Sequence, residues 1–161
     1  MKLWKVCLSL LGVGVVGGIL WADKKAVKRS EEVKKRYKGY YNVVNQWLRN
    51  KNENRDVVSY FINNNFSKIA IYGMGEMGNR LYEELRGTDI KVAYFIDKNA
   101  EEIYYSEDDI PVIGLDDIEN QEKVDAIIVT PIYDFDSIEE ALLERSVEAE
   151  IISLEDIIYE V

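Results

Sequence analysis

The sequence feature that most constrains the fold of this chain is a glycine-rich turn at residues 73–78, Gly-Met-Gly-Glu-Met-Gly. An apolar run at residues 69–72 precedes this turn, and a helical pattern follows it, with Met77, Leu81 and Leu85 on one face. The next apolar run ends in Asp97. Strand, glycines, helix, strand and acid in this order, with the acid about 20 residues after the glycines, are typical of a dinucleotide-binding βαβ unit.

Each part of this pattern predicts a role in binding a ligand. Gly73 would make the tight turn, Gly75 would let a phosphate approach the backbone, and Gly78 would let the helix pack closely on the strand. The start of the helix would offer free N–H groups and its dipole to the phosphates, and Asp97 would accept hydrogen bonds from a ribose diol. The predicted cofactor site therefore contains Gly73, Met74, Gly75, Glu76, Met77, Gly78, Asp97, Lys98, Thr130 and Pro131.

Glu76 complicates this prediction. A carboxylate in the first turn of a helix interacts with the same N–H groups that a phosphate would use, so it competes with phosphate binding. The form GxGEMG nevertheless resembles the turn of glutamyl-tRNA reductases, which use NADPH. The alternative interpretation is that the glycines only make a tight strand-to-helix turn and that Asp97 only caps a loop.

Beyond residue 67, apolar runs and helical patterns alternate. We expect strands at residues 68–72, 91–96, 112–113, 125–130 and 150–152, and helices at residues 76–86, from about 116, at 136–145 and at 154–160. The strands are continuously apolar, as in a parallel sheet that is covered on both faces. This alternation predicts an α/β fold, a Rossmann-like, doubly wound, five-stranded parallel sheet of order 3-2-1-4-5.

Charge is distributed unevenly along the 161 residues. Residues 1–55 hold 13 Lys and Arg against 4 Asp and Glu, a net charge of +9, whereas residues 56–161 hold 7 against 26, a net charge of −19. Two segments with different surroundings are therefore expected. A domain this acidic repels nucleic acid, whose binding requires phosphate-neutralising Lys and Arg, so the sequence predicts no nucleic-acid partner.

The first 23 residues predict a transmembrane anchor. Residues 6–22 form a run of 17 residues without a charge, which is at the short limit for a membrane span. Trp4 and Trp21 stand where aromatic rings lie at the headgroup level, so the membrane contact would extend over residues 4–22. The basic excess is greater after the run than before it, which predicts a single-pass membrane protein with its α/β domain in the cytoplasm.

The first 23 residues also permit two alternatives to the anchor. A cleaved signal peptide needs small residues at its cleavage site, and the large Trp21 stands there instead. A buried or interfacial helix is the other alternative, because four glycines in the run lower its helix propensity.

Residues 24–66 are expected to form a basic helical lead-in. A helix from residue 24 to about residue 50 would carry one apolar face, made by Val33, Tyr37, Tyr40, Val44 and Trp47. We favour docking of this face on the chain's own domain over a short coiled coil, because two heptads are few for a coiled coil. A second helix at about residues 56–62 would end at the asparagines of residues 63–65, since Asn tolerates the left-handed conformation of helix ends.

Catalytic and metal-binding patterns are weak in this sequence. The chain has no histidine, and its one cysteine, Cys7, lies in the apolar run, so no disulfide within the chain and no cysteine zinc site are expected. Tyr94 and Lys98 match the YxxxK spacing of short-chain dehydrogenases, but that pair must share a helix face and here falls on an expected strand. We therefore predict no catalytic residues and no metal ligands.

Three stretches together resemble a known group of proteins: Lys-Ile-Ala-Ile-Tyr-Gly-Met-Gly-Glu-Met-Gly-Asn-Arg-Leu-Tyr-Glu-Glu-Leu at 68–85, Tyr-Phe-Ile-Asp-Lys at 94–98 and Ile-Pro-Val-Ile at 110–113. They are similar to the small Rossmann-like modules of bacterial surface-polysaccharide systems, over residues 67–161. In the related sugar acyltransferases such a module binds a nucleotide sugar, which implies roles for Gly73, Gly75 and Asp97. The acyltransferase repeat domain is missing here, so the resemblance implies no acyltransferase activity.

The sequence therefore predicts a membrane-anchored module, non-catalytic alone, that binds a nucleotide-type small molecule, either NAD(P) or an NDP-sugar. It would serve bacterial glycan or polysaccharide biosynthesis beside a glycosyltransferase or another glycan-assembly protein, with at most weak self-association. One alternative is an NAD(P)-dependent oxidoreductase subunit that borrows a substrate domain. The other is an interaction scaffold whose ligand site is vestigial.

Overall fold

The computed structural model describes residues 3–101 and 109–161, and side chains from residue 24 on. The chain divides into two compact units, Met1–Asn42 and Val43–Val161. The second unit contains one sheet whose strands are β1 (Lys68–Tyr72), β2 (Lys91–Ile96), β3 (Val112–Ile113), β4 (Ala126–Val129) and β5 (Glu150–Ser153). These five strands are all parallel and lie in the order β3-β2-β1-β4-β5, so the predicted α/β class and strand order are confirmed.

Strand β1 lies at the centre of the sheet and pairs with β2 on one side and β4 on the other. Its last residue, Tyr72, is paired with Ile96 and with Val129, so these three strands end level with one another. The order of the strands reverses between β1 and β4, which makes their carboxyl ends the switch point of the fold.

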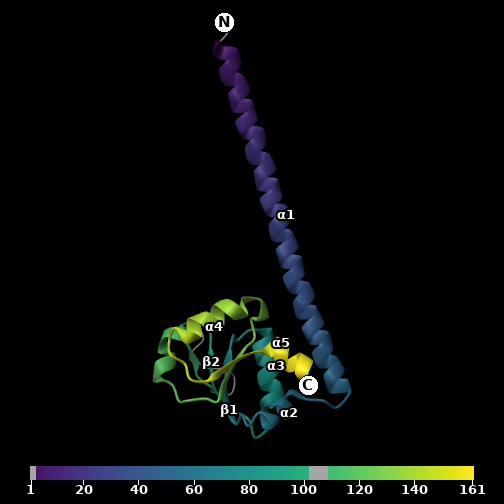
Figure 1. Cartoon of the computed structure of the whole chain (residues 1–161), viewed down its shortest axis with the longest axis vertical. Helices are drawn as coiled ribbons and strands as arrows, with labels where there is room; N and C mark the ends of the chain where they lie inside the picture. The colour runs from purple at the N-terminus through teal and green to yellow at the C-terminus, as the bar shows by residue number, and fades with distance from the viewer. Residues whose placement is uncertain (1–2, 102–108) are drawn as a thin grey trace. The chain divides into compact units, whose positions relative to one another are not determined.

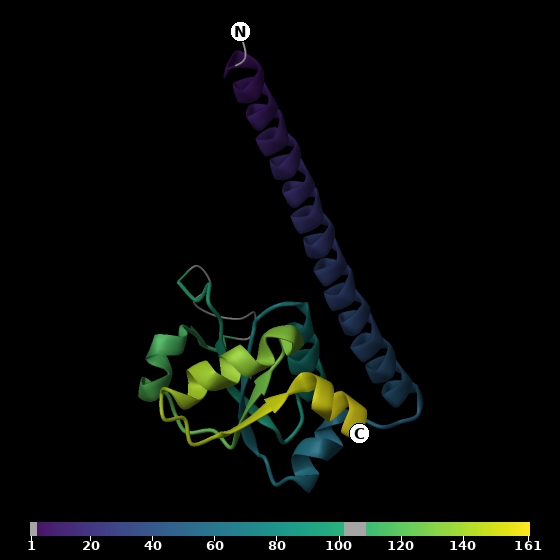
Figure 2. The same cartoon turned by 45° about the horizontal axis from the view of Figure 1, so that its top comes forward.

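Helices cover both faces of the sheet, as the continuous apolar strands require. One apolar layer contains the helices α2 (Val57–Asn63), α3 (Glu76–Leu85) and α5 (Leu154–Glu160), with Phe61, Leu81 and Ile157 fully buried. The opposite layer contains α4 (Phe135–Leu143) and the short 3₁₀ helix η1 (Leu115–Asn120). Figures 1 and 2 show α4 on one side of the strands and α3 and α5 on the other.

The segment from about residue 116 differs from its expected form, because it is the 3₁₀ helix η1 rather than an α-helix. Only Ile118 of this helix is buried, so a short helix is enough to place this side chain in the core. Helix α2 ends as expected within the asparagine run, where Asn65 adopts a positive φ of 59°.

Helix α1 (Leu3–Asn52) is one continuous helix rather than a membrane span followed by a separate lead-in helix. The predicted single-pass membrane localisation is corrected here, because no helix in the described part of the chain is both long enough and apolar enough to cross a bilayer. From Lys24 on, where its side chains are described, α1 carries charges in almost every turn as far as Lys38, so this part of the helix has no apolar run long enough to span a bilayer. The side chains of residues 1–23, on which the predicted anchor depended, lie outside the described residues.

The predicted docking face of the lead-in helix is only partly correct. Trp47 is 7% exposed and packs in the core of the second unit, but Val44, in the same unit, is 47% exposed. Val43, four residues before Trp47, is also buried. Within the second unit, the last turns of the helix therefore pack on the domain through Trp47, as predicted, and through Val43 in place of the predicted Val44.

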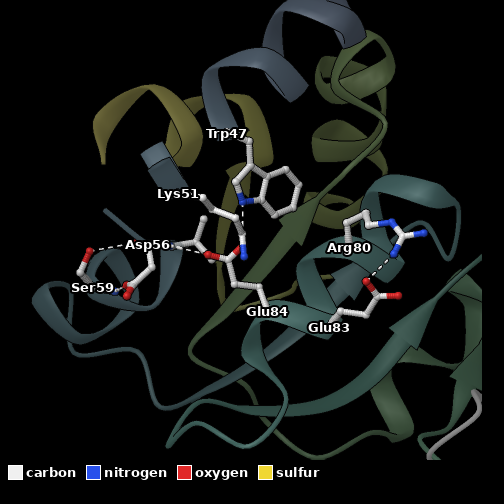
Figure 3. A network of polar contacts seen from close by, with 8 residues as sticks. Trp47, Lys51, Asp56, Ser59, Arg80, Glu83 and Glu84 are labelled. Atoms are coloured by element: carbon white, nitrogen blue, oxygen red, sulfur yellow. Dashed lines mark hydrogen bonds and ion pairs between the residues drawn. The ribbon is translucent and has the colours of Figure 1, made fainter. Parts of the chain in front are cut away.

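A polar cluster fixes these last turns (Figure 3). The Nε1–H of Trp47 donates to the carboxylate of Glu84 over 2.7 Å, and the Nζ of Lys51 lies 3.1 Å from the same carboxylate. Three residues after Trp47, on the same face of the helix, the side-chain amide of Asn50 donates to the carbonyl of Ile158 in α5 over 2.7 Å. Residues distant in sequence thus tie the end of α1 to both α3 and α5.

Candidate functional site

The glycine turn begins with a backbone conformation that requires glycine. Gly73 follows β1 with a φ of +94°, which side chains other than glycine rarely adopt. A Cβ atom here would also lie 2.8 Å from Oγ1 of Thr130 and 3.0 Å from Pro131. The Gly73 N–H donates to the carbonyl of Ile96 over 2.8 Å, so the hydrogen bonding between β1 and β2 continues into the first residue of the turn.

The other two glycines have different surroundings. A Cβ atom at Gly78 would lie 2.0 Å from the carbonyl oxygen of Gly73, so close packing of helix α3 on the turn requires glycine at this position. A Cβ atom at Gly75 would meet nothing within 4 Å. Gly75 is therefore exposed to open space, while Gly73 and Gly78 hold the shape of the turn.

Helix α3 starts at this turn with its backbone donors uncapped by side chains. Its N-cap residue is Gly75, which has no side chain, and no side-chain hydrogen bond caps the helix. Glu76 in the first turn points into solvent with 91% of its side chain exposed, and its nearest described cation is Arg80 at 3.8 Å. The first N–H groups of a 10-residue helix are thus available for an anion, with Glu76 beside them.

Asp97 lies at the end of β2 and faces the glycine turn. Its Oδ2 accepts a hydrogen bond from the backbone N–H of Met74 over 2.8 Å, and its Oδ1 accepts one from the N–H of Asn99 over 2.9 Å. These two bonds orient the carboxylate. A carboxylate offers about four acceptor positions, so Asp97 keeps one further lone pair on each oxygen for a ligand hydroxyl.

Thr130 and Pro131 close the turn from the end of β4. The buried Thr130 hydroxyl lies 3.0 Å from the carbonyl oxygen of Tyr72 and 3.2 Å from that of Gly73, and it donates to these acceptors. The Thr130 N–H donates to Tyr72 over 3.0 Å as well. The Thr130 hydroxyl is therefore buried and stabilises the turn through its carbonyl groups, and it does not face solvent.

The remaining predicted residues are less closely grouped. Met74 and Met77 are partly buried and pack on the core that contains α3, so their side chains serve the fold. Lys98 is exposed in the loop after β2. The structure thus brings Gly73, Met74, Asp97, Thr130 and Pro131 together at the switch point, with the start of α3 beside them.

Tyr72 is a site residue that the sequence reasoning missed. Burial raises the pKa of its hydroxyl above the ordinary value of 10.0, and the negative charge of Asp97 raises it further, while Arg145 acts in the opposite direction. The phenol is therefore neutral at physiological pH, in the electrostatic field of Asp97. Its position as the last residue of β1, next to Gly73, is the sequence signal that could have identified it.

This arrangement can bind an anion next to a polar group that carries hydroxyls. The uncapped N–H groups of α3 suit phosphate oxygens, and the carboxylate of Asp97 suits a diol. In the described part of the chain, no cluster of three or more Asp, Glu or Cys side chains could hold a metal ion.

Comparison with known proteins identifies a family for this segment. The sequence model of the family described as C2185-like, N-terminal, matches residues 65–153, which is more than half of the chain. The match runs from just before β1 to the end of β5, so it includes the glycine turn, Asp97 and Thr130. No curated protein matches the chain.

Proposed function

The chain belongs to the C2185-like, N-terminal family, and we propose that its α/β domain binds a nucleotide-type small molecule at the glycine turn. The observation that supports this proposal most strongly is the juxtaposition of an uncapped helix start and an oriented carboxylate at the switch point between β1 and β4. Ligands of doubly wound sheets bind at this position.

The diphosphate and the ribose of such a ligand would each contact a different part of the site. The diphosphate lies against the N–H groups at the start of α3, in the open space beside Gly75. The ribose diol donates to the free lone pairs of Asp97, whose carboxylate is already held in place by Met74. The negative charge of Glu76 opposes the phosphates, so affinity should rise when that charge is removed.

We further propose that the module is non-catalytic alone and that the ligand is NAD(P) or an NDP-sugar. The resemblance to modules of bacterial surface-polysaccharide systems favours the NDP-sugar, with a glycan-assembly protein as the partner. An oxidoreductase subunit would instead bind NAD(P) at the same turn, so the identity of the ligand separates the two functions.

Isothermal titration calorimetry of the full chain with NAD⁺, NADPH, UDP and UDP-glucose tests the proposal. Asp97→Ala should weaken binding by about 1–3 kcal/mol, because a charged hydrogen bond to the ribose is lost. Asp97→Asn retains an acceptor for Met74 and should separate the effect of the charge from that of the turn. Asp89→Asn, an exposed acid after α3, is the matched control and should bind as the wild type does.

Gly75→Val tests the proposed phosphate position independently of Asp97. Valine should be tolerated by the fold, because the Cβ position is open and the φ of −87° is ordinary, yet its methyl groups would fill the space of the phosphates. We expect an unchanged melting temperature and lost binding. The proposal is refuted if the folded wild type binds none of the four nucleotides at millimolar concentration, which would favour the scaffold alternative.

A further inference from the structure

A cavity lies at the opposite end of the sheet from the glycine turn. It has a volume of about 770 Å³ and is lined by Tyr94 of β2, by the segments that lead into β4 and β5, and by Arg145 after α4. Small-molecule sites in proteins typically measure roughly 300–1,000 Å³. The strands are parallel, so this cavity and the turn at Gly73 are separated by the length of the strands.

Tyr94 supplies the polar group at the base of this cavity. The residue is only 3% exposed, yet its hydroxyl has no hydrogen-bond partner among the described residues. No fully buried side-chain oxygen in the described part of the chain is without a partner, so the Tyr94 oxygen must reach the cavity that its side chain lines. Burial and the nearby charge of Glu122 raise the pKa of this phenol, which therefore stays protonated and can donate.

Except for the exposed Glu119, the charged side chains that line the cavity have ion-pair or hydrogen-bond partners. Glu122 accepts from the Nζ of Lys68 over 2.7 Å and from the Nζ of Lys91 over 2.9 Å. At the rim, Lys123 pairs with Glu148, and the Arg145 guanidinium lies 2.6 Å from the Oδ1 of Asp116. Because both lining cations are engaged, the cavity lacks an uncommitted positive group for a phosphate or carboxylate.

The remaining lining suits a neutral molecule. Ile118, Val124, Val147 and Ala149 form apolar patches, and uncharged polar groups from Tyr94, Gln121 and Ser146 lie between them. Alternating apolar patches and neutral hydrogen-bonding groups match a ligand that carries both C–H faces and hydroxyl groups. From this we propose that the cavity is a binding site for an uncharged, hydroxyl-rich small molecule of the size of a mono- or disaccharide, held by a hydrogen bond to Tyr94.

The test is an amide-resolved NMR titration of the full chain with two uncharged probes, methyl α-glucoside and maltose, and one charged probe, glucose 6-phosphate. We expect saturable shifts at the amides of Val124, Val147 and Ala149 with the uncharged probes, and weaker binding of the phosphate. The amide of Gly75 should not move with the uncharged probes, which separates this site from the proposed nucleotide site.

Variants decide whether Tyr94 makes the contact. Tyr94→Phe removes only the hydroxyl and should weaken binding roughly threefold to tenfold, the worth of one neutral hydrogen bond. Ala149→Leu should abolish binding by filling the cavity, and Tyr159→Phe, on an exposed tyrosine of α5, should change nothing. Unchanged affinity in Tyr94→Phe, tighter binding of glucose 6-phosphate, or no saturable shift at 100 mM sugar would each overturn the proposal.

Discussion

The indole of Trp47 donates a hydrogen bond of 2.7 Å to the carboxylate of Glu84, 37 residues further along the chain. This carboxylate is almost buried, with 7% of its side chain exposed, and it also lies 3.1 Å from Lys51 and 3.3 Å from the N–H of Val57. Three donors from two other segments thus converge on one residue of α3, the helix that begins at the glycine turn (Figure 3).

We expect Trp47→Phe to lower the free energy of unfolding by about 1–3 kcal/mol, because it removes one donor from a nearly buried carboxylate. Chemical denaturation monitored by circular dichroism measures the change. Leu48→Ala, at an exposed position one residue along, is the control and should have little effect. Equal losses in the two variants would show that the hydrogen bond to Glu84 contributes nothing specific.

A chain that begins at Val57 should be less stable than the full chain by a few kcal/mol. The truncation uncovers the core beneath Val43 and Trp47 and deprives the Ile158 carbonyl of its bond from Asn50. Thermal unfolding of the two proteins measures the difference. A melting temperature equal to that of the full chain would mean that the end of α1 does not stabilise the domain.

The glycine turn should tolerate a methyl group at one glycine and not at another. Gly78→Ala should lower stability by about 1–3 kcal/mol or more, because the new Cβ would lie 2.0 Å from the Gly73 carbonyl and α3 must shift. Gly75→Ala should be neutral or slightly stabilising, since its Cβ meets nothing and alanine restricts the unfolded chain. Paired denaturation curves check this contrast, and equal effects would contradict it.

Thr130→Val should loosen the turn. The substitution keeps the shape of the side chain but removes the hydroxyl that donates to the carbonyls of Tyr72 and Gly73, at a cost of about 1–3 kcal/mol. Thr130→Ser retains the hydroxyl and should recover most of that loss. Unfolding free energies of both variants, with nucleotide affinity as a second readout, distinguish the hydrogen bond from packing.

The stability contributed by Asp125 should depend on pH. Hydrogen bonds from the backbone N–H groups of Ser67 and Lys68 hold its pKa below the ordinary value of 3.8. A carboxyl group whose pKa is lowered by folding stabilises the fold above its unfolded pKa, and this contribution disappears as pH falls through the folded pKa. The stability difference between wild type and Asp125→Ala should therefore be largest near neutral pH and shrink below about pH 4.

Denaturation at pH 7 and at progressively lower pH, down to the acid limit of the fold, measures this difference. Glu148→Ala is the control, because Glu148 pairs with Lys123 at a fully exposed site where solvent screens the interaction. A difference for Asp125→Ala that stays constant with pH would contradict the assignment.

Local patterns in the sequence were sufficient to predict the sheet and the glycine turn. The bounds of β1 and β2 follow from their apolar runs, and the positive φ of Gly73 follows from a strand that must turn at once into a helix. Parallel strands joined by right-handed crossovers leave few topologies, so alternation also predicted the order 3-2-1-4-5 and the placement of Asp97 near the turn. These features depend on neighbours in the chain and on the general geometry of α/β folds.

Other features depend on which surfaces meet, and only the tertiary structure decided them. Val43 and Val44 are chemically identical neighbours, and the direction in which α1 approaches the domain decides that Val43 is buried. The roles of Glu84 and of the Thr130 hydroxyl likewise depend on partners 27 to 58 residues away, and the role of Tyr94 depends on a cavity between separate segments. Periodicity and spacing along the sequence do not predict such long-range contacts. These contacts form only when the whole sheet and its helices pack together.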